Sequence, residues 1–355
     1  MTRRILLALF LVLTAVSCGT SSGLDDDQTP RSRYAGTQGE LAVGPIPEAV
    51  VRNADGRELR MAIEYPIRAG TYPLIIFSPG YAAQPQSYVG LTSHWASQGY
   101  VVVKPVHEIT RAGSASADVW QQHGQTEWRN RVRDITFIID SLDLLEQTYP
   151  ELQGKIDRTK IGVGGHSYGA FTAMLLGGGR TFPGAVSYAD PRVTAVMAIS
   201  PQGPGSVRGL TEESWAELSK PTLFMTGTRD QGTTAEETPE WRRKAFELSP
   251  AGDKWLVIVP NAGQNTFTGR RSALGEPPPA DSTLAGDPPF PDPFREPLQQ
   301  RRPAREGVAG SRERSLGSDI RAISLAFWDT YLRASTEGRT TLENGAARGV
   351  EVVKK

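Results

Sequence analysis

Short apolar runs recur through the middle of the chain and alternate with stretches of helical periodicity. A continuous apolar run of four to eight residues predicts a buried strand, covered by helices on both faces as in a parallel sheet. Glu58–Tyr65 instead alternates apolar and polar residues, which predicts a half-exposed edge strand. The apolar runs are Leu74–Phe77, Tyr100–Val103, Lys160–Gly165, Val193–Ile199, Thr222–Gly227 and Lys254–Val259.

Helical spacing of apolar residues separates these runs. The clearest stripe lies within Glu127–Thr148, where Val132, Ile135 and Ile139 recur at intervals of three and four. Because strands and helices alternate, the pattern predicts an α/β fold with a mostly parallel central sheet and helices on both faces. The other predicted helices are Ser87–Gln98, Tyr168–Leu176, Arg242–Leu248 and Ile320–Leu332.

The N-terminal residues 1–18 have the pattern of a signal peptide. Thr2–Arg4 is positively charged, and the apolar stretch Ile5–Val16 is too short to span a bilayer as a helix. The single cysteine, Cys18, follows Ala15–Ser17 and resembles the lipobox cysteine of a bacterial lipoprotein, although Leu is more usual than Ala three places before it. We therefore expect an exported, cell-envelope protein anchored to the membrane only by a lipid on Cys18. A secreted or periplasmic protein is the alternative.

The rest of the chain divides into a linker and one domain. Residues 19–39 are polar and rich in Gly, Ser and Thr, as in a flexible tether. Residues 40–355 form the predicted single domain, with a Pro-rich excursion at about 270–306 in which nine prolines fall between Pro277 and Pro303. That excursion is either a lid over the site or a surface loop.

Charge and composition narrow the possible partners. Lys+Arg 39 balances Asp+Glu 39, so no net field attracts nucleic acid. The basic cluster Arg129–Arg133 is interpreted as the solvated face of a helix. No set of histidines, cysteines or carboxylates has metal-ligand spacing, and no phosphate loop is present, so neither a metal nor a cofactor is expected. Nothing in the sequence requires more than a monomer.

A G-x-S-x-G motif is the strongest chemical signal. Gly165–Gly169 places Ser167 between an apolar strand pattern and a helical one, which is the context of a nucleophile elbow. Asp230 follows a later strand and suits the acid that orients and stabilises an imidazolium. Backbone N–H groups of Tyr168 and Tyr81, or of Ala82, are candidates for an oxyanion hole.

These pieces, taken in order, resemble bacterial α/β-hydrolases of the dienelactone-hydrolase-like and platelet-activating-factor acetylhydrolase-like group, neighbours of polyester-degrading cutinase-like enzymes. The resemblance covers roughly residues 58–335 and implies a serine esterase with an α/β-hydrolase fold. It rests on Tyr72–Gly80, Gly99–Val103, His107, Asp134–Ile135, Gly162–Gly169, Pro221–Asp230 and Asn261–Phe267.

The sequence departs from that family at the position of the catalytic base. The family's last motif is Gly-Ala-x-His-x-x-Phe, and here Gln264 occupies the histidine position. A glutamine amide can donate to Asp230 and accept from the Ser167 hydroxyl, but it cannot take up a proton near neutral pH. No histidine follows Ser167 in this sequence. His107 lies just past a strand and is the one candidate for a surrogate base, with a second-layer or pocket role as its alternative.

The remaining histidines offer no other base. His166 belongs to the elbow and is expected to point away from the serine hydroxyl, whereas His94 and His123 have no predicted link to the site. Three hypotheses follow: a carboxylic-ester hydrolase that is impaired at its base, an inactive protein that binds an ester or acyl ligand or a partner, and an active enzyme in which Gln264 is an engineered or accidental substitution.

Overall fold

The computed structural model describes residues 32–107, 117–182, 184, 186–205, 209–232, 235–268, 306–345 and 349–355, without the side chains of 117–126 and 306–315. Residues Arg33–Lys355 form one compact unit. Cys18 with the predicted signal peptide, and the Pro-rich excursion up to residue 305, lie outside the described residues.

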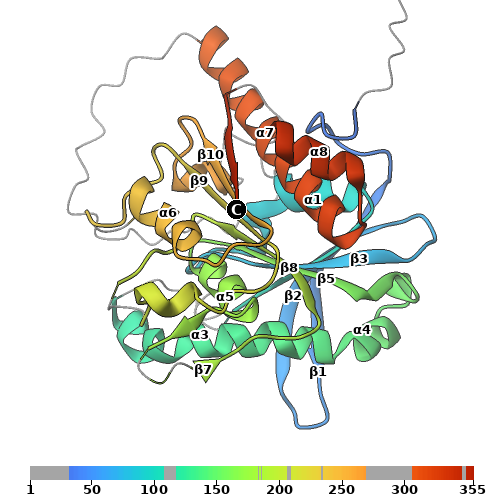
Figure 1. Ribbon diagram of the computed structural model, residues 1–355. Coiled ribbons are helices and arrows are strands. Elements are labelled where there is room, and N and C mark those ends of the chain that lie inside the picture. The colour runs from blue at the N-terminus through green and yellow to red at the C-terminus, as the bar shows by residue number, and fades with distance from the viewer. Residues whose placement is uncertain are drawn as a thin grey trace, which may run out of the picture. The chain divides into compact units, whose positions relative to one another are not determined.

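A nine-stranded sheet, in the order β1-β2-β4-β3-β5-β8-β9-β10-β11, runs through this unit (Figure 1). Neighbouring strands from β4 to β10 pair in parallel, whereas β1–β2, β2–β4 and β10–β11 are antiparallel. The strands are β1 Val43–Arg52, β2 Glu58–Pro66, β3 Tyr72–Ser78, β4 Val101–Pro105, β5 Ile156–His166, β8 Val193–Ile199, β9 Thr222–Gly227, β10 Lys254–Val259 and β11 Glu351–Lys354. The predicted fold class, an α/β-hydrolase fold, is confirmed.

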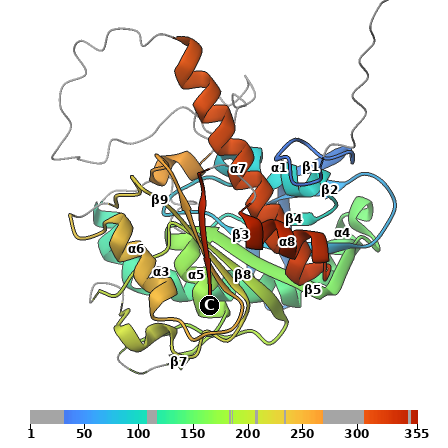
Figure 2. The ribbon, with the colours of Figure 1, turned by 45° about the horizontal axis from the view of Figure 1, so that its top comes forward.

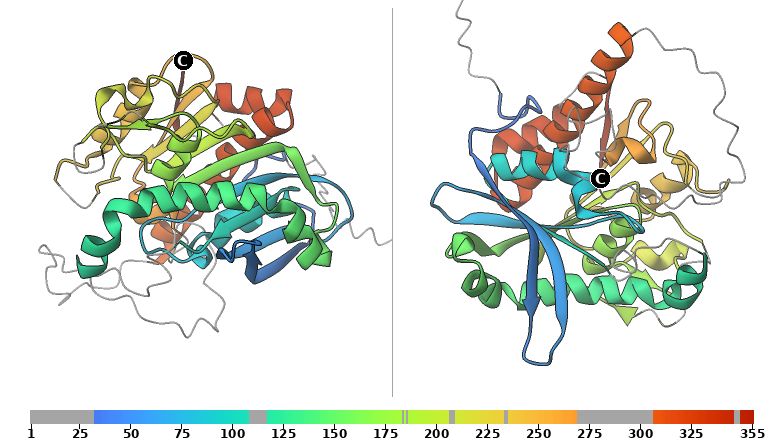
Figure 3. Two further views of the ribbon diagram at one scale, coloured as in Figure 1. Left: turned by 90° about the horizontal axis from the view of Figure 1, so that it is seen from below. Right: turned by 180° about the vertical axis from the view of Figure 1, so that it is seen from behind.

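The prediction that Glu58–Tyr65 is an edge strand is wrong. It forms β2, which is paired on both sides, and the edge belongs to β1. The two strands form a hairpin that projects from the body of the molecule in the right panel of Figure 3. The polar positions of β2 do not mark an open edge, because Glu64 is buried beside Met61 and Ile63 and pairs with Lys104 of the neighbouring strand β4.

Helices cover both faces of the sheet (Figure 2). On one face, α1 (Val89–Ser97) and α7 (Glu306–Leu332) contact each other and the strands beneath, and α8 (Thr336–Asn344) packs on α7. On the other face lie α3 (Ala117–Asp140), α5 (Tyr168–Leu176) and α6 (Pro239–Glu247). None of the described helices is long and apolar enough to span a membrane.

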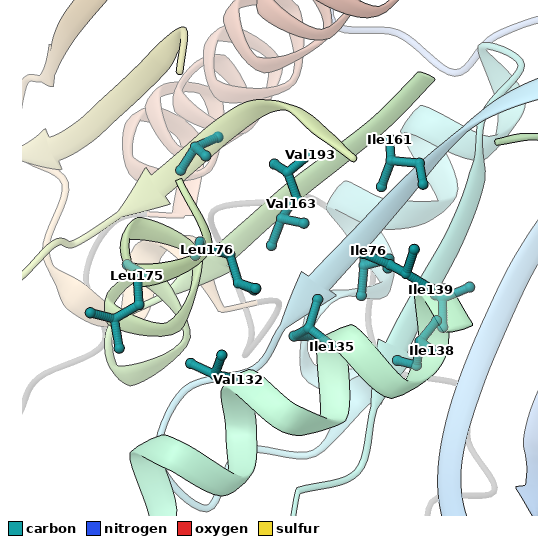
Figure 4. Packing of buried hydrophobic residues seen from close by; sticks show 14 of the residues in the cluster. Ile76, Val132, Ile135, Ile138, Ile139, Ile161, Val163, Leu175, Leu176 and Val193 are labelled. Carbon is teal, nitrogen blue, oxygen red and sulfur yellow. The ribbon is translucent and has the colours of Figure 1, made fainter. Parts of the chain in front are cut away.

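The apolar stripe predicted on Glu127–Thr148 is the inner face of α3. Val132, Ile135 and Ile138 are almost fully buried and pack toward Ile76 and Val163 of the sheet (Figure 4). The helix is not continuous to Thr148 as predicted, because the chain breaks at Ser141 and resumes as α4 (Leu142–Thr148). This packing fixes α3 beside the loop that leaves β3.

Smaller elements complete the chain. A two-stranded ribbon pairs β6 (Arg180–Thr181) with β7 (Val186–Ser187). Single 3-10 turns are η1 (Pro85–Tyr88), η2 (Pro150–Leu152), η4 (Glu212–Trp215) and η5 (Gln264–Phe267). Of these, η1 and η5 follow the loops at the carboxyl ends of β3 and β10, beside the predicted site.

Candidate functional site

Ser167 lies on a strained turn between β5 and α5. Its backbone has φ 52° and ψ −116°, a conformation that a residue with a side chain rarely adopts and that typically costs about 1–3 kcal/mol. The flanking glycines allow the turn, because a Cβ on Gly165 would lie 2.2 Å from the Gly169 carbonyl oxygen, and one on Gly169 would lie 1.9 Å from that of Ser78. This is the geometry expected of a nucleophile elbow.

Gln264 contacts the Ser167 side chain directly. It is the first residue of η5, and its Nε2 donates a hydrogen bond of 3.0 Å to the Ser167 Oγ. Phe267, at the other end of η5, is 1% exposed and anchors the turn in the core. The structure therefore places Gln264 where the sequence motif predicted it, against the serine hydroxyl.

Asp230 is buried directly after β9. Thr226 Oγ1 donates to its Oδ2 at 2.8 Å, and the Arg242 Nε lies 3.1 Å from its Oδ1. Burial raises the pKa of Asp230, and the Arg242 charge and the Ser200 and Thr226 hydroxyls offset only part of that effect. Both members of the ion pair are almost fully buried.

The expected hydrogen-bonded chain from Ser167 through Gln264 to Asp230 is not formed. Among the described residues, the Gln264 amide hydrogen-bonds the serine alone, and Asp230 Oδ1 receives no hydrogen bond. The amide donates to Ser167 rather than accepting from it, and Arg242 takes the place beside Asp230. The physical reason is charge: a buried carboxylate is compensated better by a guanidinium than by a neutral amide.

Backbone hydrogen bonds between loops hold these residues together. The Ser167 N–H donates to the Ile199 carbonyl at 2.8 Å, which ties the elbow to the end of β8. The Arg229 N–H donates to the Ala262 carbonyl at 3.0 Å, which ties the loop after β9 to the loop after β10. Because parallel strands end at one edge of the sheet, these bonds bring the loops that carry Ser167, Asp230 and Gln264 together.

His107 has other partners than Ser167. Its Nε2 lies 2.9 Å from Ser78 Oγ and its Nδ1 lies 2.8 Å from Asp134 Oδ2. The ring is fully buried, and burial, followed by the Arg131 charge, lowers the pKa of His107 to about 4. With both ring nitrogens engaged, His107 has none left for the Ser167 hydroxyl, so this conformation does not support it as a surrogate base.

Among the described side chains, no other histidine hydrogen-bonds the Ser167 hydroxyl. His166 is buried, with Nδ1 3.0 Å from the Tyr88 hydroxyl, and burial lowers the pKa of His166 to about 3. His94 is buried in α1, and burial lowers its pKa to about 3 as well. His123 belongs to α3, and its side chain is outside the part of the chain that the structure describes.

The loop carrying Tyr81 is fixed by residues that the sequence did not single out. Arg131 donates to the carbonyls of Pro79 and Gly80, at 2.8 and 3.3 Å, and its guanidinium lies 4.6 Å from the centre of the Tyr168 ring. The prediction that the Arg129–Arg133 cluster is a solvated face is wrong for Arg131, whose side chain has no exposed surface. A signal was present, because residue 131 lies one helical turn before Ile135 on the apolar stripe.

In the described part of the chain, no three histidine, cysteine or acidic side chains come together in a way that could hold an ion.

Two comparisons connect this geometry to known proteins. The chlorophyllase family model matches residues 37–204, which include Ser167 and end before Asp230 and Gln264. A segment of 156 residues is 29% identical to a bis(hydroxyethyl) terephthalate hydrolase of Streptomyces coelicolor. That match covers 44% of this chain and 39% of the relative. The fold, the serine elbow and these similarities place the chain in the α/β-hydrolase superfamily.

Proposed function

We propose that this protein is a serine hydrolase of the carboxylic-ester type whose turnover is limited by the missing base. In this proposal Ser167 is the nucleophile, Asp230 the acid, and the N–H groups of Tyr81 and Tyr168 the oxyanion donors. The observation that carries it is the 3.0 Å contact between Gln264 Nε2 and Ser167 Oγ, which puts an amide where an imidazole would act.

The chemistry shows what the amide can and cannot do. Ser167 Oγ attacks the ester carbon, the carbonyl oxygen becomes an oxyanion, and the alcohol then leaves with a proton. An imidazole would take the serine proton and deliver it to that alcohol. Gln264 has no site that is basic near neutral pH, so both transfers fall to water. Loss of a triad base costs about 10⁴–10⁶ in turnover in other serine hydrolases, and a similar penalty is expected here.

The substrate class is a small ester, and an aromatic ester is the first to test. The relative named above is a hydrolase of bis(hydroxyethyl) terephthalate, so that diester is a rational trial substrate. The resemblance to dienelactone-hydrolase-like and platelet-activating-factor acetylhydrolase-like esterases also belongs to this proposal. So does anchoring through Cys18, which radiolabelled palmitate incorporation into the full chain, with Cys18→Ala as control, would test.

A second candidate is an inactive protein that binds an ester or acyl ligand. The hydrogen bond from Gln264 favours it, because an amide that donates to Ser167 Oγ occupies a lone pair of the nucleophile. Such a protein would bind esters and release them unchanged.

Three purified proteins separate the candidates: the chain as given, Ser167→Ala and Gln264→His. We expect p-nitrophenyl acetate and bis(hydroxyethyl) terephthalate to be cleaved slowly by the first, and several orders of magnitude faster by Gln264→His. Asn265→His is the matched control, because it adds a histidine at the neighbouring, exposed position. If the chain as given and Gln264→His both match Ser167→Ala, the hydrolase proposal fails and the binding protein is favoured.

A serine-directed fluorophosphonate gives an independent readout. Labelling that disappears in Ser167→Ala would show a nucleophilic serine even where turnover is too slow to follow. Added imidazole should raise the rate of Gln264→Gly, in which the amide no longer occupies the place beside Ser167, since it supplies the missing base.

A further inference from the structure

The loop after β3 is held from beneath by one buried cation. Arg131 reaches it from α3 and donates to two successive carbonyls, those of Pro79 and Gly80. Its Nε lies 3.0 Å from Glu127 Oε1, one turn earlier on the same helix, and neither side chain has any exposed surface. The cation is thus charge-compensated and fixed in direction.

Peptide geometry turns this contact into a statement about the Tyr81 N–H. The carbonyl of Gly80 and the N–H of Tyr81 belong to one planar, trans peptide, so they point in opposite directions. When Arg131 holds the carbonyl toward α3, the Tyr81 N–H points away from α3, and the Ala83 N–H also donates to this carbonyl, at 3.3 Å. The same donation draws electron density toward the carbonyl oxygen and makes that N–H a stronger donor.

The preceding peptide is fixed at both ends. Its carbonyl, that of Pro79, accepts from Arg131 at 2.8 Å, and its N–H, that of Gly80, donates to the Tyr88 hydroxyl at 3.0 Å. The loop therefore has little freedom to rotate. Arg131 also lies over the ring of Tyr168, whose backbone N–H follows Ser167 at the start of α5.

We infer that Arg131 is a positioning residue, which orients the Tyr81 N–H toward the oxygen that becomes negative when Ser167 attacks an ester. This inference rests on the proposed function for its catalytic consequence, but the orientation of the peptide can be measured without turnover. In this inference, α3 takes part in the site by fixing the loop after β3 through Arg131.

The first test follows the peptide itself. Protein labelled with ¹⁵N-tyrosine gives a separate amide signal for Tyr81, assigned by its loss in Tyr81→Phe. In Arg131→Met the Gly80 carbonyl, which shares a peptide with the Tyr81 nitrogen, loses its hydrogen bond from Arg131. The Tyr81 signal should therefore move more than those of tyrosines outside the loop. Arg57→Met is the matched control, since Arg57 also pairs with an acid of α3, Asp134, and stacks on a ring, 5.0 Å from the centre of Phe137.

The second test follows catalysis in the Gln264→His background. Loss of one oriented oxyanion donor costs about 10²–10³ in turnover, so Arg131→Met should lower kcat about 100-fold with KM changed less than about threefold. Arg131→Lys keeps the charge without the fork and should lose about tenfold. It also serves if the methionine variant does not fold.

The outcomes are distinguishable. An unmoved Tyr81 signal, or a folded Arg131 variant with the kcat of its parent, would overturn the inference. If no protein exceeds Ser167→Ala in rate, the proposed function fails, whereas a moved Tyr81 signal would still show that Arg131 orients this peptide.

Discussion

Replacing Arg242 by methionine removes the buried partner of Asp230 and should destabilise the fold strongly. The Arg242 side chain is 2% exposed and Asp230 is fully buried, with 3.1 Å between Nε and Oδ1. Arg242 also donates to the backbone carbonyls of Asp230, Ser200 and Pro201, at 2.8, 2.9 and 3.1 Å. Methionine fills much of the volume and satisfies none of these acceptors.

The magnitude follows from the uncompensated groups. Removing one member of a buried ion pair costs about 3–5 kcal/mol, and each carbonyl left without a donor adds to this unless water enters. We therefore expect the free energy of unfolding to fall by about 4 kcal/mol at pH 7.5. Arg243→Met is the control, because that neighbouring side chain is 40% exposed and loses only a surface pair, worth about 0.5 kcal/mol.

The loss of unfolding free energy in Arg242→Met should depend on pH and become smaller on acidification. Burial already raises the pKa of Asp230 above its ordinary value of 3.8, and Arg242 is the strongest opposing influence, so the variant's folded pKa rises further. A raised carboxyl pKa means that folding favours the protonated form. The penalty is thus complete above the raised pKa and diminishes as pH falls toward 3.8.

Urea unfolding of the parent and both variants, at pH 7.5 and pH 5, measures these quantities. The Arg242→Met deficit should be smaller at pH 5 than at pH 7.5. A deficit below about 1 kcal/mol at pH 7.5, or one that grows on acidification, would refute the argument that an uncompensated Asp230 carboxylate is the cause.

Three further predictions concern the same frame. Gly169→Ala should unfold the protein or abolish fluorophosphonate labelling of Ser167, because its Cβ would lie 1.9 Å from a carbonyl oxygen; Gly205→Ala, with open space around it, should change neither. Burial keeps His107 neutral and lowers its pKa from 6.5 to about 4 in the folded protein. Its contribution to the free energy of unfolding is therefore complete above pH 6.5, and about 3 kcal/mol is lost as pH falls to about 4. In His107→Gln, the free energy of unfolding should change less with pH across that range. Asp329→Ala should cost about 3 kcal/mol and speed proteolysis near Arg33, which Asp329 binds at 2.6 Å.

The pattern of apolar residues predicted the central strands of the sheet and the helix that follows the serine. Strands β8, β9 and β10 and helix α5 begin and end where the apolar runs and flanking residues indicated. The edge strands β1 and β11 were not predicted, because their residues are partly exposed and their pairing depends on distant segments. The break at Ser141 had no proline or glycine to mark it.

The candidate site divides in the same way. Ser167 and Gln264 could be found because a motif ties each to a turn of defined geometry. Hydropathy alone does not find Arg131 and Arg242, because it assigns arginine to solvent, whereas both are buried in ion pairs. The partner of Arg131 is Glu127, one turn earlier on the same helix, whereas the fold brings Asp230 beside Arg242. Both lie on apolar helix stripes, four residues before Ile135 and Phe246, and an arginine within such a stripe is itself an indication of a buried ion pair.

The last strand has a consequence for handling the protein. All six residues of β10 are buried, and β11 pairs with the side of β10 that β9 leaves open. Without β11, the Trp-Leu-Val-Ile-Val run of β10 would become an open edge with high β-propensity and no proline, a pattern that promotes aggregation. In its place, β11 presents an edge that carries Glu351 and Lys354. We therefore expect removal of β11, by trimming the C-terminal residues, to make the protein more prone to aggregate.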